Sequence, residues 1–200
     1  MKHITTKLFF AAALTAILAT LASAAPIPVT INTAGLVGAG SIDIQFNPGS
    51  FPAMYNPGTA TITNFVITGG SLGSVAFGPD GGAVGGGALP GPLAITNADF
   101  LNGIVYNATF GSQVSFLVDF TGTAYTGTGQ SILTSFYVNL TAGNSSTSAI
   151  ADLIGGSTLD TAQSSASVVF GQTGNVPEPS TLGLLSAGLG AVMLAARRRR

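Results

Sequence analysis

The chain has 200 residues, enough for one ordinary domain, and only 6% of them are charged. All six basic residues lie in the first seven or the last four positions, so residues 25–176 contain six aspartates and no Lys, Arg or His, a formal charge of −6. Without cations this region is not expected to bind nucleic acid. Because residues 25–176 contain no histidine or cysteine, a Ser-His-Asp triad, a catalytic cysteine, a structural zinc site and disulfides are all excluded there.

The first 24 residues predict a cleaved secretory signal peptide. Lys2 and Lys7 precede an apolar run over 8–21, and Ala22 and Ala24 supply small side chains at the −3 and −1 positions. Cleavage is expected after Ala24, so that the mature chain begins at Ala25. This pattern predicts export through the Sec translocon and processing by signal peptidase; an uncleaved membrane anchor is the alternative.

Residues 25–170 predict an all-β extracytoplasmic domain. Apolar and polar residues alternate over 42–46, 114–120 and 132–140, as in strands that bury one face. Further strands are expected over 27–32, 60–68, 72–77, 103–110 and 166–170. Turn signals such as Asn47-Pro48-Gly49 lie between them. Many short strands with this punctuation favour an antiparallel β-sandwich with a jelly-roll-like arrangement.

Glycine and proline dominate residues 78–92, which we interpret as a long mobile surface loop. The aspartates of the domain have no basic side chain to pair with. They are therefore expected to lie in solvated loops and turns or, alternatively, to bind calcium, the one cofactor that the sequence suggests. No calcium-loop motif is present, and no other cofactor is expected. The aspartates are Asp43, Asp80, Asp99, Asp119, Asp152 and Asp160.

Residues 171–176 are a predicted linker, and residues 180–196 predict a single transmembrane helix. The apolar stretch over 181–196 would span about 24 Å as a helix, slightly less than a hydrocarbon core. Four arginines follow it and would stop transfer on the cytoplasmic side of the membrane. They are Arg197, Arg198, Arg199 and Arg200.

Between linker and helix lies Val176-Pro177-Glu178-Pro179. Each proline fixes its own φ near −65° and disfavours the helical region for the residue before it. The segment is therefore expected to be extended and to stay outside the following helix. Glu178 places a negative charge near the N-terminus of that helix, where the helix dipole favours it.

The stretch "VPEPSTLGLLSAGLGAVMLAARRRR" resembles the PEP-CTERM sorting signal of Gram-negative bacteria: Pro-Glu-Pro, a transmembrane helix and a basic cluster. The resemblance implies an inner-membrane-anchored precursor that an exosortase cleaves near Pro177-Glu178-Pro179. It also implies a final location in the cell envelope, at the cell surface or outside the cell, and an association with exopolysaccharide and biofilm. "VTINTAGLVGAGSIDIQFNPG" further resembles small β-rich PEP-CTERM proteins without an assigned activity.

Three functions follow for the exported domain. The first is a structural or adhesive surface protein without catalytic activity, with exosortase and exopolysaccharide as partners. The second is a carbohydrate-binding, lectin-like module that stacks sugars on Tyr55, Tyr106, Tyr125 or Tyr137. The third, a hydrolase with paired aspartates, has no marked pair to support it, so the chain is not expected to be an enzyme.

Overall fold

The computed structural model describes residues 25–36, 38–49, 56–80, 84–85, 87–127, 134–155 and 158–171. Residues Pro26–Thr173 form one compact unit. The predicted signal peptide, the transmembrane helix over 180–196 and all of the linker except Gly171 lie outside the described residues. Within the described ranges, no helix has the length and apolar character needed to cross a membrane.

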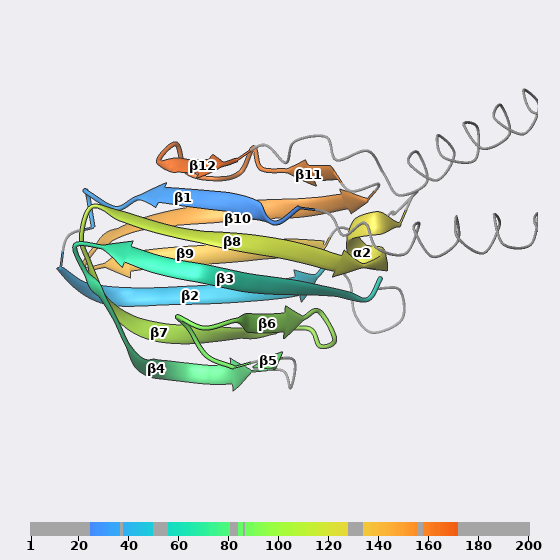
Figure 1. Cartoon of the computed structure of the whole chain (residues 1–200), viewed down its shortest axis with the longest axis horizontal. Helices are drawn as coiled ribbons and strands as arrows, with labels where there is room; N and C mark the ends of the chain where they lie inside the picture. The colour runs from blue at the N-terminus through green and yellow to red at the C-terminus, as the bar shows by residue number, and fades with distance from the viewer. Residues whose placement is uncertain are drawn as a thin grey trace, which may run out of the picture. The chain divides into compact units, whose positions relative to one another are not determined.

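The domain consists of two six-stranded antiparallel sheets that pack face to face, with their strands running in similar directions (Figure 1). In spatial order, sheet A contains β12 (Val168–Phe170), β1 (Ile27–Asn32), β8 (Gln113–Gly122), β3 (Gly58–Thr68), β6 (Leu93–Thr96) and β5 (Val84–Gly85). Sheet B contains β11 (Thr158–Asp160), β10 (Ser145–Gly155), β9 (Thr134–Ala142), β2 (Gly38–Pro48), β7 (Gly103–Phe110) and β4 (Ser71–Asp80). A short helix, α2 (Thr123–Thr126), follows β8.

The strand order has the connectivity of a jelly roll. The chain crosses between the sheets at each step from β1 to β4, and later strands pair with earlier ones in nested order: β3 with β6, β2 with β7 and β1 with β8. Strands β9 to β11 then extend sheet B beside β2, and β12 extends sheet A beside β1. The predicted all-β sandwich is confirmed.

The alternating sequence patterns match the two faces of their strands. Ile42, Ile44 and Phe46 of β2 are fully buried, whereas the side chains between them point outward. The same alternation buries every second residue of β8 and β9. Because a shift of one residue in register would turn each set to solvent, this pattern fixes how the strands lie on the core.

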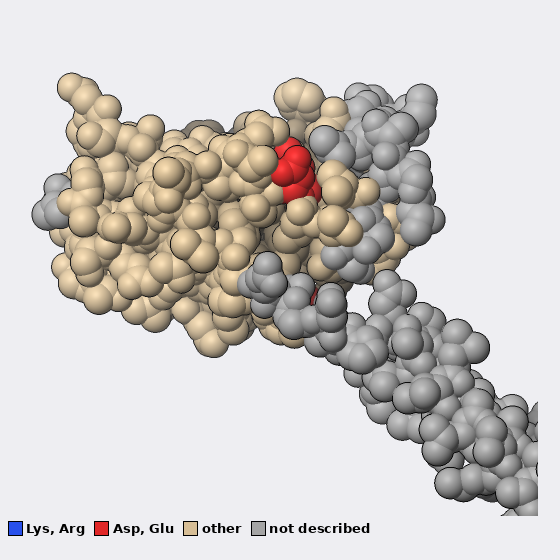
Figure 2. Space-filling model, turned by 90° about the horizontal axis from the view of Figure 1, so that it is seen from above, with Lys and Arg blue, Asp and Glu red and all other residues tan. Residues whose placement is uncertain are grey.

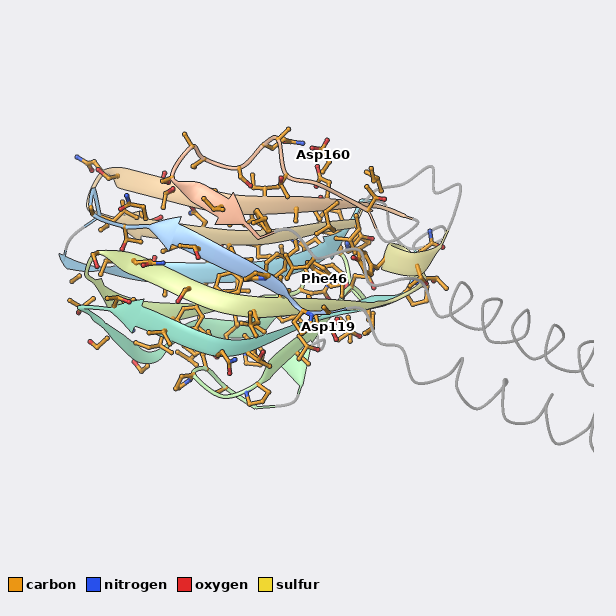
Figure 3. All side chains as sticks on the ribbon, turned by 45° about the horizontal axis from the view of Figure 1, so that its top comes forward. Phe46, Asp119 and Asp160 are labelled. Carbon is orange, nitrogen blue, oxygen red and sulfur yellow. The ribbon has the colours of Figure 1, made fainter. Side chains whose placement is uncertain are left out.

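Aromatic side chains fill the centre of the sandwich, where Phe46 lies between the two sheets (Figure 3). Phe120 of sheet A contacts Phe46 and Phe136 of sheet B, with ring centroids 5.9 and 5.4 Å apart, and also Tyr125 of α2 at 5.7 Å. These contacts join the two sheets and the helix around one ring. Burial of such a side chain contributes about 1.5–3 kcal/mol to stability.

The structure corrects the prediction for residues 78–92. Instead of one surface loop, β4 continues to Asp80 and β5 pairs with β6. Leu89 is buried in the hydrophobic core, and its backbone N–H donates a hydrogen bond of 3.3 Å to the hydroxyl of Tyr106. Among the described side chains of this segment, Leu89 is the large apolar one that is buried, and the high glycine and proline content concealed it.

Candidate functional site

The outer surface of sheet B carries polar side chains in register, which we call the polar face. Three neighbouring strands, β10, β9 and β2, place their outward residues in three rows. The rows are Ser148-Asn139-Asp43, Ile150-Tyr137-Gln45 and Asp152-Ser135-Asn47. Side chains that lie directly opposite each other on neighbouring antiparallel strands are close enough to hydrogen bond.

Hydrogen bonds within the polar face satisfy most of these groups. Gln45 Nε2 donates to Asp43 Oδ2, and Asn47 Nδ2 donates to Gln45 Oε1, both at 2.8 Å. Ser148 Oγ donates to Asn139 Oδ1 at 3.0 Å. The polar face is therefore an ordered network in which amides and hydroxyls hold one another.

Asp43 is the half-buried carboxylate of this face. Burial raises the pKa of Asp43 above its ordinary value of 3.8, and the hydrogen bond from Gln45 partly opposes that rise. No lysine, arginine or histidine lies between residues 25 and 171 to pair with it. The described surface in Figure 2 shows acidic atoms and no basic ones.

On sheet A, Asp119 is likewise a partly buried carboxyl group with a raised pKa. Burial raises the pKa of Asp119, and a hydrogen bond from the backbone of Phe120 partly opposes it. The pKa of Tyr125 is also raised, first by burial and then by the negative charge of Asp119. Asp43 and Asp119 lie on the outer surfaces of opposite sheets, so the fold does not bring them together as an acid/base pair.

These two shifts predict that the protein is more stable at about pH 4 than at pH 7. A raised pKa means that the folded state binds the proton more tightly than the unfolded chain. The stabilisation is complete below the ordinary value of 3.8 and is lost as the pH rises through the folded-state values of Asp43 and Asp119. Thermal unfolding of the chain as a function of pH measures this.

Asp43→Asn should raise the melting temperature at pH 7 and weaken its pH dependence, because the amide oxygen can still accept from Gln45. The matched control is Asp99→Asn, which removes an exposed loop charge. A melting temperature that falls on acidification, or an Asp43→Asn variant that is less stable at pH 7, would contradict the assignment.

The only directly opposed pair of carboxylates in the described sheets is Asp152 of β10 and Asp160 of β11. Asp152 is buried, and its two oxygens accept hydrogen bonds from Ser135 Oγ at 2.5 Å and Gln163 Nε2 at 3.0 Å. Asp160 lies at the edge of the sheet (Figure 3) and accepts from the backbone N–H of Ala162. Neutral donors thus take the place of the cations that the domain lacks.

The fit to calcium is poor in the part of the chain that the structure describes. It contains no group of three or more acidic, histidine or cysteine side chains close enough to share a metal. Calcium requires six to eight oxygen ligands. Asp152 and Asp160 would supply two carboxylates, and both oxygens of the Asp152 carboxylate already accept hydrogen bonds from Ser135 and Gln163. The side chain of Asp80 lies outside the described residues.

The tyrosines proposed for sugar stacking are largely inaccessible. Tyr106 and Tyr125 are buried in the core. Tyr137 is partly exposed within the polar face, where its hydroxyl accepts a long hydrogen bond of 3.5 Å from Ser148. Tyr55 lies outside the described residues. Stacking of a sugar on Tyr106 or Tyr125 is therefore excluded, and Tyr137 is the one tyrosine of the described residues that is partly accessible.

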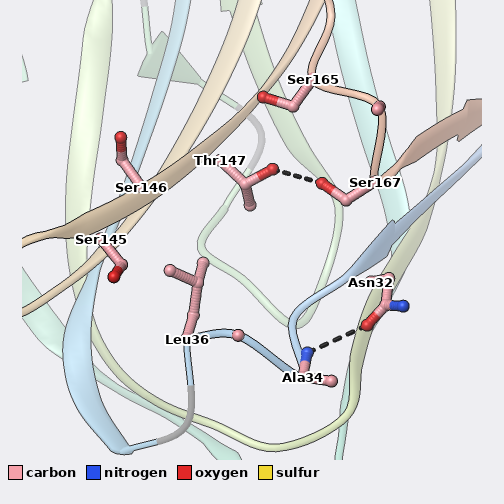
Figure 4. A pocket seen from close by; sticks show the side chains of 10 residues that line it. Asn32, Ala34, Leu36, Ser145, Ser146, Thr147, Ser165 and Ser167 are labelled. Carbon is pink, nitrogen blue, oxygen red and sulfur yellow. Dashed lines mark hydrogen bonds between the residues drawn. The ribbon is translucent and has the colours of Figure 1, made fainter.

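A pocket of about 440 Å³ lies where three segments meet (Figure 4). Its lining comes from Asn32 and residues 34–36 after β1, residues 145–147 at the start of β10, and residues 165–167 before β12. Thr147 Oγ1 and Ser167 Oγ hydrogen bond across it at 2.6 Å. The sequence analysis missed this site, although two hydroxyl-rich runs, "SSTS" over 145–148 and "SSAS" over 164–167, mark it.

The residues predicted for sorting and processing fall almost entirely outside the described residues. They are Ala22, Ala24, Val176, Pro177, Glu178, Pro179 and the arginines at 197–200. Ala25 is described and is exposed. Their roles remain predictions from the sequence.

A family model of the PEP-CTERM protein-sorting motif matches residues 175–200. The chain carries a PEP-CTERM sorting domain. This match spans the predicted proline-glutamate-proline motif, the apolar segment and the arginines. The PEP-CTERM motif indicates exosortase-targeted sorting of an exported, membrane-anchored precursor. No curated protein and no solved structure matches the chain.

Proposed function

We propose that this PEP-CTERM protein is a non-catalytic structural or adhesive component of the cell surface or extracellular matrix, associated with exopolysaccharide and biofilm. The observation that carries the proposal is the sorting motif at 175–200 downstream of a domain without Lys, Arg, His or Cys. After the precursor has passed through the Sec translocon, signal peptidase would cleave it so that the mature chain begins at Ala25. Exosortase would then cleave the chain near Pro177-Glu178-Pro179.

The described domain suits a structural role. Its core is continuous across both sheets, and its half-buried polar face is held by internal hydrogen bonds. The carboxylates with raised pKa values, Asp43 and Asp119, face away from each other on opposite surfaces. In the one opposed pair of the described sheets, Asp152 and Asp160, the buried Asp152 is held by Ser135 and Gln163. These arrangements support a scaffold more than a glycoside hydrolase, which needs two accessible carboxyl groups in one site.

Cell fractionation tests this proposal. In biofilm-forming cells we expect the mature protein in the matrix fraction, and we expect its deletion to lower matrix cohesion. When expressed in the deletion strain, a variant with both Asp43 and Asp119 replaced by asparagine should restore matrix cohesion as fully as the parent chain does. Mature protein found only in the spent medium, or a matrix that depends on those two carboxylates, would argue against a structural role.

The alternative function is a carbohydrate-binding, lectin-like module. One feature favours it: the hydroxyl-lined pocket between β1, β10 and β12. The structural and the binding functions are compatible, since an adhesive matrix protein has to hold some component of the matrix.

A further inference from the structure

The pocket has an uncharged polar lining. Five of the residues that line it are serine or threonine, one is asparagine, and the others are alanine, glycine and leucine. No aspartate lines it, so it offers no carboxylate to a metal ion. No basic residue lines it either, so a phosphate or a uronate would enter without a compensating charge. The chemistry of the lining therefore selects neutral polar ligands.

Three polar groups around the pocket are free to bind. The Asn32 side-chain oxygen accepts from the backbone N–H of Ala34 at 3.0 Å, which orients the amide and leaves Nδ2 without a protein partner among the described residues (Figure 4). Within the same ranges, the hydroxyls of Ser145 and Ser146 make no hydrogen bond to protein, and both are exposed. They stand on the opposite wall from Asn32.

The remaining hydroxyls of the lining are fixed. Thr147 and Ser167 bond to each other, and Ser165 Oγ accepts the backbone N–H of Ser148 at 3.0 Å. The backbone beneath is held as well, because Asn32 N–H donates to the carbonyl of Ser167 at 2.9 Å. The pocket is thus preformed, and binding there would cost little ordering of the chain.

The lining also has an apolar side. Leu36 is buried, and Ala34 and Ala166 also line the pocket. A pocket of this volume, with an apolar floor and a few free polar groups, has the make-up of a small-molecule site. Hydroxyls and an amide beside an apolar floor match a sugar ring, which presents hydroxyls at its edge and C–H groups on its faces.

We propose that this pocket binds a neutral sugar residue of a polysaccharide. The inference deepens the proposed association with exopolysaccharide by giving it a site, and it rests on that association for its biological setting. Ser145, Ser146 and Asn32 are the positioning contacts, and Leu36 forms the floor. Binding is expected to be weak, because no aromatic ring lines the pocket to stack on the sugar.

NMR titration of the full chain tests this site. The ¹⁵N-labelled protein is held in a detergent without a sugar head group and titrated with neutral monosaccharides and oligosaccharides. A uronic acid and a glycine-serine peptide serve as comparison ligands. We expect saturable shifts of the backbone amides of Gly35, Ser145 and Ser146 with neutral sugars only.

Two variants and one control locate the binding. Replacing Ser145 and Ser146 together by alanine should weaken binding about fivefold for each hydroxyl removed. Gly35→Phe should abolish it, because an added Cβ at this lining position meets no atom within 4 Å and the ring can occupy the opening. Thr121→Ala removes an exposed hydroxyl at the far end of β8 and should bind as the parent does. Melting temperatures verify that each variant is folded.

The proposal is overturned if no neutral sugar shifts these amides, if the uronic acid or the peptide is preferred, or if the folded serine variant binds as tightly as the parent. Any of these results would leave sorting and a structural role untouched, since those are tested by the termini of the mature protein and by fractionation.

Discussion

Replacing Phe120 by alanine is expected to lower the free energy of unfolding by about 3–5 kcal/mol. Phe120 is 2% exposed, and its ring contacts Phe46, Phe136 and Tyr125. The substitution removes the apolar surface and leaves a cavity between two sheets that cannot close over it. The aromatic pairs add about 0.5–1.5 kcal/mol each beyond the buried area. Chemical denaturation of parent and variant measures the difference.

Phe77→Ala is the matched control. Phe77 lies on the edge strand β4 and is 64% exposed, so its removal should change stability by no more than about 0.5 kcal/mol. Because typical domains are stable by about 5–15 kcal/mol, Phe120→Ala removes a large share of the stability. Similar losses for the two variants would show that the two sheets do not share the core described above.

The second large effect is expected at the sorting motif. Replacing Pro177 and Pro179 by alanine and Glu178 by glutamine should leave the precursor unprocessed. The prolines are expected to keep this segment extended, whereas alanine should allow the predicted helix over 180–196 to begin further upstream. An extended backbone without internal hydrogen bonds is what a protease-like enzyme can grip. The mass of the cell-associated protein reports whether the C-terminal segment is still attached.

Two further variants sharpen this experiment. Double replacement of Gln172 and Thr173 by alanine changes residues just before the matched 175–200 and should leave processing intact. Glu178→Gln alone separates the charge from the prolines: normal processing would assign recognition to the extended backbone, and a block would assign it to the carboxylate. Normal processing of the triple variant would remove the motif from the mechanism.

Hydrophobic alternation predicted most of the strands whose inner residues are large, although the short strand β6, which buries Leu93 and Ile95, was not predicted. Ile42, Ile44 and Phe46 alternate with polar residues, and the structure buries each of them. Strand β10 escaped prediction because its inner face includes Ala149 and Ala151, whose small side chains give a weak pattern among serines. The structure places both alanines in the core, on a strand that pairs with β9.

Of the candidate sites, the sorting motif could be predicted from the sequence, whereas the pocket and the polar face could not. The sorting motif is a contiguous stretch, so proline geometry, apolar length and terminal charge are all visible in the sequence. The pocket instead brings Asn32, at the end of β1 in sheet A, near Ser145 and Ser146 of β10 in sheet B and near Ser165, all of which are far from Asn32 in the chain. The hydroxyl-rich runs were visible, but nothing in the sequence states that they face the segment after β1. The polar face likewise depends on the register of β2, β9 and β10.

We propose that the chain is exported, cleaved at both ends and released as the sandwich domain. The intact mass of the mature protein recovered from the cell surface or matrix tests it directly. A species that begins at Ala25 and ends near Val176 is the expected result. A species that retains the apolar segment and the four arginines at 197–200 would contradict exosortase processing.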